Sequence, residues 1–145
     1  MVRANSHADI FIRTVADAGI PYQFVASRGL YAKPVILDIL AYLKLLDNYH
    51  ENPAMWRVLN YGIWGLKESE LIKLNQFAKK KARSLYEIAR EACNFDFTPE
   101  TVAMFVNVLG LIEKHTSFAR DRDVGKVLWA FLSDSGYLKD LTRED

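Results

Sequence analysis

The residues of this chain that could do chemistry are cations and aromatic rings around one turn and the helix that follows it. Trp64, Gly65 and Lys67 lie in the turn, and a basic run ends the helix. Backbone amides beside a glycine and the ammonium of a lysine can hold a phosphate group, and an exposed tryptophan can stack on a nucleobase. If the chain contacts nucleic acid, the candidate residues are Trp64, Gly65, Lys67, Lys79, Lys80, Lys81 and Arg83, and contacts with phosphates alone would be weak and non-specific.

Plainer interpretations stay open for the same residues. A basic run at the C-terminal end of a helix also suits the helix dipole, so these side chains could be only a solvated helix end. Trp56, Trp64 and Trp129 could be base-stacking platforms or core residues. Trp64 is the best candidate for exposure because it lies in a turn, whereas Trp129 adjoins an apolar stripe and is expected in the core.

The remaining polar residues form no evident acid–base or metal constellation. The histidines His7, His50 and His115 lack the paired spacing of metal ligands, so no metal site is expected. Cys93 is the single cysteine, which excludes an intrachain disulfide, and it is expected to be a small buried hydrophobe. The other polar residues near helix ends fit turn or capping positions: Asn94, Asp96, Asp121 and Asp123.

Length and composition are those of one domain or of two small lobes. Of the 145 residues, 50% are hydrophobic and 26% are charged, which is ordinary for a soluble protein. The net charge of +1 gives no global field that would select nucleic acid or a membrane, so any such site must be a local patch. No apolar run reaches the roughly 18 residues of a membrane span, and no signal peptide follows Met1. We expect a cytoplasmic location and no membrane partner.

The element on which the others should pack is a helix over residues 34–49. Its apolar residues recur with the i, i+3, i+4, i+7 spacing of one helix face, and further apolar residues widen that stripe almost all round. A helix of this kind is buried by other elements. The predicted core stripe is Ile36, Ile39, Leu40, Leu43 and Leu46.

Periodicity and capping residues predict a mainly α fold, a multi-helix bundle with a short β element near the N-terminus. The strongest helix start is Thr98-Pro99-Glu100, a cap followed by a proline and an acid in the first turn. Alternating β formers predict a strand from Tyr22 to Ala26, and Val2 with Arg3 could end a second strand. The remaining helices are expected over 7–18, 54–59, 67–82, 85–93, 99–118, 124–135 and 137–141.

Four short motifs follow one another in the first part of the chain. An Arg-x-Asn element at Arg3 precedes a helix, and Gly-Ile-Pro-Tyr follows at residues 19–22. The helix over residues 34–49 then contains Asp-Ile-Leu-Ala-Tyr-Leu at 38–43. Arg-Val-Leu-Asn at 57–60 is followed by Gly65-Leu66 and a further helix. In this order and spacing the motifs resemble superfamily 1 DNA helicases of the UvrD/Rep/PcrA type.

The resemblance implies a role for each part of the chain. Residues 1–49 would form the edge of motor domain 2A, and residues 50–145 a helical 2B-like insertion. Arg3 would be the arginine that reaches the γ-phosphate of a nucleotide, so ATP and Mg would be cofactors of the parent enzyme. Two positions depart from the family pattern. Val2 replaces an aromatic residue, and Lys67 replaces the second glycine of a Gly-Ile-Gly turn whose amides hold a DNA phosphate.

Nucleotide hydrolysis needs residues that this sequence does not contain. It has no Gly-x-x-x-x-Gly-Lys-Ser/Thr loop to cradle phosphates and no Asp-Glu pair for magnesium. We therefore expect the chain alone to hold no cofactor and to hydrolyse no ATP, and we interpret it as a fragment. Its partners would be DNA and the remaining motor domains of the parent helicase.

The resemblance predicts an accessory 2B-like subdomain of an ATP-dependent 3′–5′ DNA helicase, which contacts duplex DNA and regulates unwinding in DNA repair or replication. The alternative, from a different class, is a helical protein–protein interaction module without a nucleic-acid role. An exposed apolar groove would favour the interaction module, and a contiguous basic face would favour the helicase interpretation.

Overall fold

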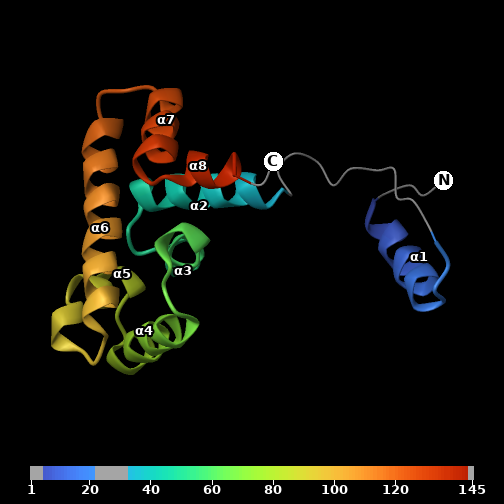
Figure 1. The fold of residues 1–145 in the computed structure, drawn as a ribbon, viewed down its shortest axis with the longest axis horizontal. Coiled ribbons are helices and arrows are strands. Elements are labelled where there is room, and N and C mark those ends of the chain that lie inside the picture. Colours follow the sequence, from blue (N-terminus) through green and yellow to red (C-terminus); the bar gives the residue numbers. More distant parts are fainter. Residues whose placement is uncertain (1–4, 22–32, 144–145) are drawn as a thin grey trace. The chain divides into compact units, whose positions relative to one another are not determined.

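The computed structural model describes residues 5–21 and 33–143, with side chains from Ile10 onward in the first range. The chain divides into two compact units, Met1–Leu37 and Asp38–Asp145. Residues 5–21 contain one α-helix, residues 33–143 contain α-helices and two short 3₁₀ turns, and neither range contains a strand (Figure 1). The mainly α prediction is thus confirmed for these residues. The predicted strand 22–26, Val2 and Arg3 lie outside them.

The first unit contains helix α1, Asn5–Asp17, and its end is fixed by Gly19. Gly19 has a φ of +65°, a conformation that a residue without a Cβ adopts at little cost. Its amide donates to Ala16 O at 3.0 Å, and the amide of Ile20 donates to Val15 O at 3.1 Å. These two bonds form a Schellman motif that ends α1 at Asp17, next to the predicted end at Ala18. The side chains of Ile10 and Phe11 on this helix are exposed.

Helix α2, Pro34–Asp47, begins where the sequence predicts and carries its second half into the larger unit. There Tyr42 and Leu45 are fully buried, and the Tyr42 ring stacks on Phe131 with centroids 3.9 Å apart. Leu40, in the predicted core stripe, is instead 37% exposed. The prediction of the buried face was wrong, because a helix that is apolar nearly all round does not mark which face its neighbours cover. The assignment of residues 1–49 and 50–145 to two helicase domains stays a prediction.

The larger unit is a helical bundle in which α6 and α7 lie side by side (Figure 1). Helix α5 packs against α6, and α3 and α4 pack against α5. The core contains Val58, Leu74, Ile88, Phe105, Ile112 and Phe131, each nearly or fully inaccessible to solvent. The elements after α2 are α3 (Asn52–Leu59), η2 (Gly62–Trp64), α4 (Glu68–Lys81), α5 (Leu85–Arg90), η3 (Ala92–Asn94), α6 (Pro99–Ala119), α7 (Val124–Asp134) and α8 (Tyr137–Leu141).

Local hydrogen bonds begin three of these helices at the predicted residues. Ser84 caps α5 in a capping box with Glu87, whose carboxylate accepts from the Ser84 amide at 2.9 Å. The Thr98 side chain accepts from the Thr101 amide at the start of α6, and the Asp123 side chain accepts from the Lys126 amide at the start of α7. Each cap satisfies a backbone donor that has no partner inside its own helix.

Two further predicted core residues, besides Leu40, are exposed. Trp129 on α7 is 63% exposed, because it lies two positions from both Val127 and Phe131, the residues that α7 buries. Two positions correspond to about 200° around an α-helix, so Trp129 is on the opposite face. Cys93 is also exposed, because α5 ends at Arg90 and the chain continues as η3 instead of extending the buried face.

Candidate nucleic-acid interface

The turn that precedes α4 is built around Gly65. Trp64 ends η2, Gly65 follows with φ of 61° and ψ of 21°, and its amide donates to Gly62 O at 3.1 Å. A Cβ at Gly65 would meet nothing within 4 Å. The glycine is therefore favoured by its left-handed conformation, and the space beside it is open. Lys67 then takes an extended conformation and becomes the N-cap of α4.

Trp64 does not form an exposed stacking platform. Its side chain is buried, and its indole Nε1 donates to Val58 O of α3 at 2.7 Å. The prediction of exposure was wrong, because a buried hydrogen bond to the preceding helix satisfies the one polar atom of the indole. Trp64 anchors the turn to α3 and leaves Gly65 and Lys67 at the surface.

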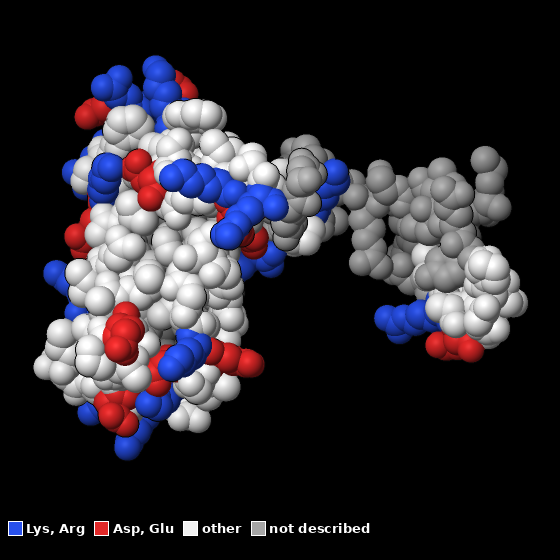
Figure 2. Space-filling model, viewed as in Figure 1, with Lys and Arg blue, Asp and Glu red and all other residues white. Residues whose placement is uncertain are grey.

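The four lysines of the predicted interface are exposed. In the described part of the chain, Lys67, Lys79, Lys80 and Lys81 form no ion pair, so their ammonium groups are available to an anion. Lys67 stands at the start of α4 and the other three at its end, and a helix of 14 residues is about 21 Å long. The cations therefore form two separate lysine clusters, Lys67 by itself at one end of α4 and three lysines at the other, rather than one row. On the face drawn in Figure 2, acidic and basic side chains are interspersed.

Arg83 differs from these lysines because two carboxylates already hold it. Its Nη1 and Nη2 atoms donate to the two oxygens of Glu91, each at 2.8 Å, and its Nε lies 3.7 Å from Glu87. The bidentate bonds from Arg83 keep the pKa of Glu91 below its usual value. The guanidinium closes the connection between α4 and α5, so it has little capacity left for a DNA phosphate.

Lys73, another lysine of α4, is also paired. Its Nζ lies 2.8 Å from Glu70 Oε1, and the other oxygen of Glu70 accepts from the Thr98 amide at 3.0 Å. Glu70 is only 4% exposed, and the bonds from Lys73 and from the Thr98 amide lower its pKa. This carboxylate ties α4 to the start of α6, a contact that no sequence pattern indicated.

A second group that the sequence did not reveal surrounds Asp38. Asp38 Oδ1 accepts from Arg57 Nε, Oδ2 accepts from the Tyr137 hydroxyl, and the backbone oxygen accepts from the Tyr61 hydroxyl. Asp38 and Arg57 both belong to the helicase-like motifs, but their types gave no signal that they pair. The group joins α2, α3 and α8 and positions the chain that leads into the Gly65 turn.

The described ranges hold neither a metal-binding cluster nor a membrane-spanning helix. Residues 5–21 and 33–143 contain no group of three histidine, cysteine, aspartate or glutamate side chains placed to hold a metal ion. In the same ranges no helix is both long and apolar enough to span a membrane.

The fold and the turn define the chain as a helical module with a solvent-facing turn of glycine and lysine. Its family follows from the sequence match: the UvrD-like helicase C-terminal domain matches residues 1–110, and the chain belongs to this family. The resemblance to UvrD/Rep/PcrA-type helicases is thereby confirmed.

The curated relatives are helicases several times longer than this chain. The ATP-dependent DNA helicase Rep of Buchnera aphidicola subsp. Baizongia pistaciae is 33% identical over 86 residues, which are 59% of this chain and 13% of Rep. The ATP-dependent DNA helicase PcrA of Staphylococcus aureus is 22% identical over 145 residues, which are 100% of this chain and 20% of PcrA. The chain therefore corresponds to a fifth or less of each.

Proposed function

We propose that this chain is the accessory 2B-like subdomain of an ATP-dependent 3′–5′ DNA helicase, with the edge of its motor domain 2A. Membership of the UvrD-like family and the printed names of the relatives support this proposal. ATP and Mg would act in the parent enzyme, with Arg3 at the γ-phosphate.

The observation that carries the DNA role is the exposed turn of Gly65 and Lys67. The first amides of α4 have no acceptor within the helix, and such amides favour an anion. Glu68 in the same turn carries a negative charge that opposes this attraction. Lys67, without an ion pair in the described part of the chain, supplies the positive charge that a phosphate contact needs here. The turn would therefore act through a side-chain charge where relatives of the resembled family use a second glycine.

The lysines at the end of α4 would extend this contact along a duplex. B-DNA presents a phosphate about every 1.7 Å of helix axis, so a duplex lying along α4 meets both lysine clusters. With few contacts and a net charge of +1, the affinity should be near 10⁻⁴ M, the weak end of roughly 10⁻⁴–10⁻⁶ M for non-specific binding. A contact of this strength suits a subdomain that changes orientation on DNA and so regulates unwinding.

The test is a titration of a forked duplex into the ¹⁵N-labelled 145-residue chain at low salt. We expect amide shifts at residues 65–67 and 79–81, reduced by Lys67→Ala and by Lys80→Ala. Lys44→Ala removes an exposed lysine from α2 and serves as the matched control, with shifts unchanged. Shifts confined to other residues, or no shifts at low salt, would refute the DNA contact.

One observation favours the second candidate, a helical protein-interaction module. Val124 and Trp129 on α7 and Val106 on α6 are each more than 60% exposed. Scattered apolar side chains are common on protein surfaces, and a binding site needs a contiguous patch of them. If the DNA titration fails, a partner protein on α6 and α7 becomes the better explanation of the chain.

A further inference from the structure

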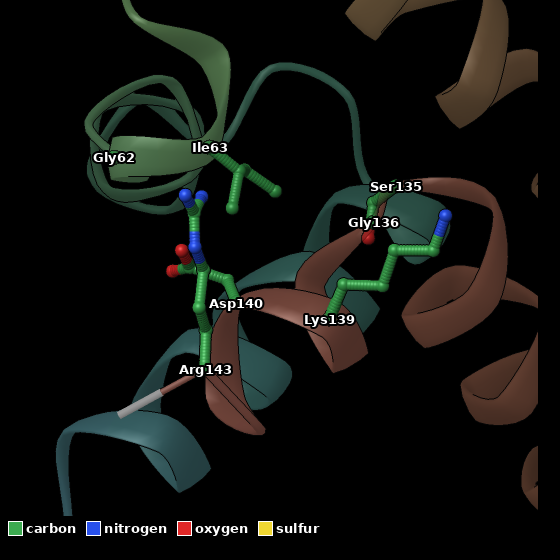
Figure 3. Close-up of a pocket in the computed structure, with 7 residues that line it drawn as sticks. All are labelled: Gly62, Ile63, Ser135, Gly136, Lys139, Asp140 and Arg143. Carbon is green, nitrogen blue, oxygen red and sulfur yellow. The ribbon is translucent and has the colours of Figure 1, made fainter. Parts of the chain in front are cut away.

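A pocket of about 360 Å³ lies in the larger unit between η2 and the end of the chain's last two helices (Figure 3). Gly136, with φ of 77°, turns the chain sharply between α7 and α8. The Tyr137 hydroxyl then fixes α8 to Asp38 of α2. These contacts set α8 opposite η2 and leave an open hollow between them. The residues that line it include Gly62, Ile63, Ser135, Lys139, Asp140 and Arg143.

The cations of the pocket are free to bind a ligand. Neither Lys139 nor Arg143 forms an ion pair with any residue in the described ranges. Lys139 lies in α8, and Arg143 follows two positions after the end of that helix. In Figure 3 the Arg143 guanidinium points toward Gly62 and Ile63, and the Lys139 ammonium lies on the Ser135 side.

The other lining groups narrow the class of ligand. The Ser135 hydroxyl already donates to Phe131 O at 2.6 Å and accepts from the Tyr137 amide, so binding falls to the two cations. Ile63 is the one large apolar side chain named in the lining, whereas cofactor and lipid pockets are mostly apolar. Asp140 offsets one of the two positive charges. The remaining single charge matches a phosphodiester, which carries one negative charge, better than a terminal phosphate dianion.

We propose that this pocket binds a backbone phosphodiester of the same DNA that the Gly65–Lys67 turn contacts. The proposal rests on the proposed function and adds a second contact on the other side of η2. Arg143 would present its planar donors to two phosphate oxygens, and Lys139 would act as a point charge. Gly62 and Lys67 are joined by five residue steps, at most roughly 17 Å of chain. One duplex, with a phosphate about every 1.7 Å of its axis, is long enough to reach both sites.

The test measures how the affinity of the 145-residue chain for a forked duplex depends on salt. Lys139→Gln combined with Arg143→Gln should reduce the slope of log affinity against log salt by about one, because the pocket would bind a single phosphate. Arg120→Gln combined with Lys126→Gln makes the same charge change at the start of α7, away from the pocket, and should leave the slope unchanged. Equal urea midpoints of the variants and the parent chain show that folding is intact.

A second measurement separates this proposal from the proposed function. Dimethyl phosphate, a free phosphodiester, should shift the amide signals of Gly62 and Gly136 in the parent chain and not in the Lys139/Arg143 variant. A slope reduced by Lys67→Ala but not by the pocket variant overturns the pocket proposal and leaves the turn contact standing. The reverse result supports the pocket and overturns the turn contact. Shifts with dimethyl phosphate without any DNA binding overturn the assignment of DNA as the ligand.

Discussion

Asp38 Oδ1 lies 2.6 Å from Arg57 Nε, and the other oxygen of Asp38 accepts a hydrogen bond from the Tyr137 hydroxyl at 2.6 Å. One carboxylate on α2 thus bonds to a residue 19 positions later, in α3, and to a residue 99 positions later, in α8. Burial, and then the bond to Asp38, raise the pKa of Tyr137 well above its ordinary value, so its hydroxyl remains a donor at neutral pH. Asp38 is therefore the polar centre around which α2, α3 and α8 are assembled.

We predict that Asp38→Ala lowers the free energy of unfolding by about 2–3 kcal/mol. The change removes the acceptor of one hydrogen bond from Arg57 Nε and one from the Tyr137 hydroxyl, and the side chain of Asp38 is only 17% exposed. Urea unfolding measures the loss. Asp47→Ala removes an exposed acid from the same helix and should change stability by less than about 0.5 kcal/mol. Equal losses for the two variants would show that the Asp38 contacts contribute nothing specific.

The buried face of α2 gives a prediction from two identical substitutions. Leu45→Ala should cost about 2–5 kcal/mol, because Leu45 is 0% exposed and its removal leaves a cavity. Leu40→Ala should cost clearly less, because Leu40 is 37% exposed and already partly in water. Thermal or urea unfolding of both variants compares them directly. A larger loss of unfolding free energy for Leu40→Ala than for Leu45→Ala would show that the stripe predicted from the sequence is the buried face of α2.

The sequence predicts those parts of this fold that depend on neighbouring residues. Ser84, Thr98 and Asp123 begin helices as expected, because a cap bonds an amide two or three positions away. Gly19 ends α1 because its left-handed conformation is a property of that one residue. The outward position of Lys79, Lys80 and Lys81 follows from the apolar spacing of α4.

The features that the sequence does not predict depend on partners in other elements of the fold. Trp64 is buried because Val58 O is within reach of its indole, and Arg83 is neutralised because Glu91 lies beside it in space. Neither contact has a sequence signature. Because of these contacts, the candidate interface consists of Gly65 and the four exposed lysines. No sequence pattern indicates Lys139 and Arg143 as a site, because they become neighbours of η2 only when α8 packs near Asp38.

A buried histidine provides the next prediction. His115 is 1% exposed; its Nδ1 lies 2.6 Å from the Tyr42 hydroxyl, and its Nε2 lies 3.0 Å from Asp134 Oδ2. With the proton on Nε2, Tyr42 donates to Nδ1 and the ring donates to Asp134, so every polar atom is satisfied. Tyr42→Phe leaves Nδ1 without a donor and should cost about 1–3 kcal/mol of unfolding free energy.

Tyr49→Phe is the matched control for this change, measured in the same urea titration. It also removes one hydroxyl, but the Tyr49 hydroxyl makes no hydrogen bond within the described residues. We expect it to change the free energy of unfolding by less than about 0.5 kcal/mol. If Tyr42→Phe is as neutral as the control, the bond to His115 does not stabilise the fold.

The contact of Glu70 with Lys73 and the Thr98 amide predicts how stability depends on pH. These bonds lower the pKa of Glu70 in the folded chain below its usual 4.5. A carboxyl with a lower pKa in the folded state stabilises the fold fully above the unfolded value, and this contribution is lost as pH falls through the folded value. Glu70→Gln cannot titrate. It should therefore be less stable than the parent chain by about 1 kcal/mol at pH 7, with a difference that shrinks below pH 4.5. Unfolding by urea at several pH values between about 7 and 3 measures the difference in stability.

Glu68→Gln alters an exposed acid of the same turn and should keep a nearly constant difference from the parent chain. A Glu70→Gln difference that stays constant down to pH 3 would mean that this carboxylate does not hold α4 to α6 through its charge.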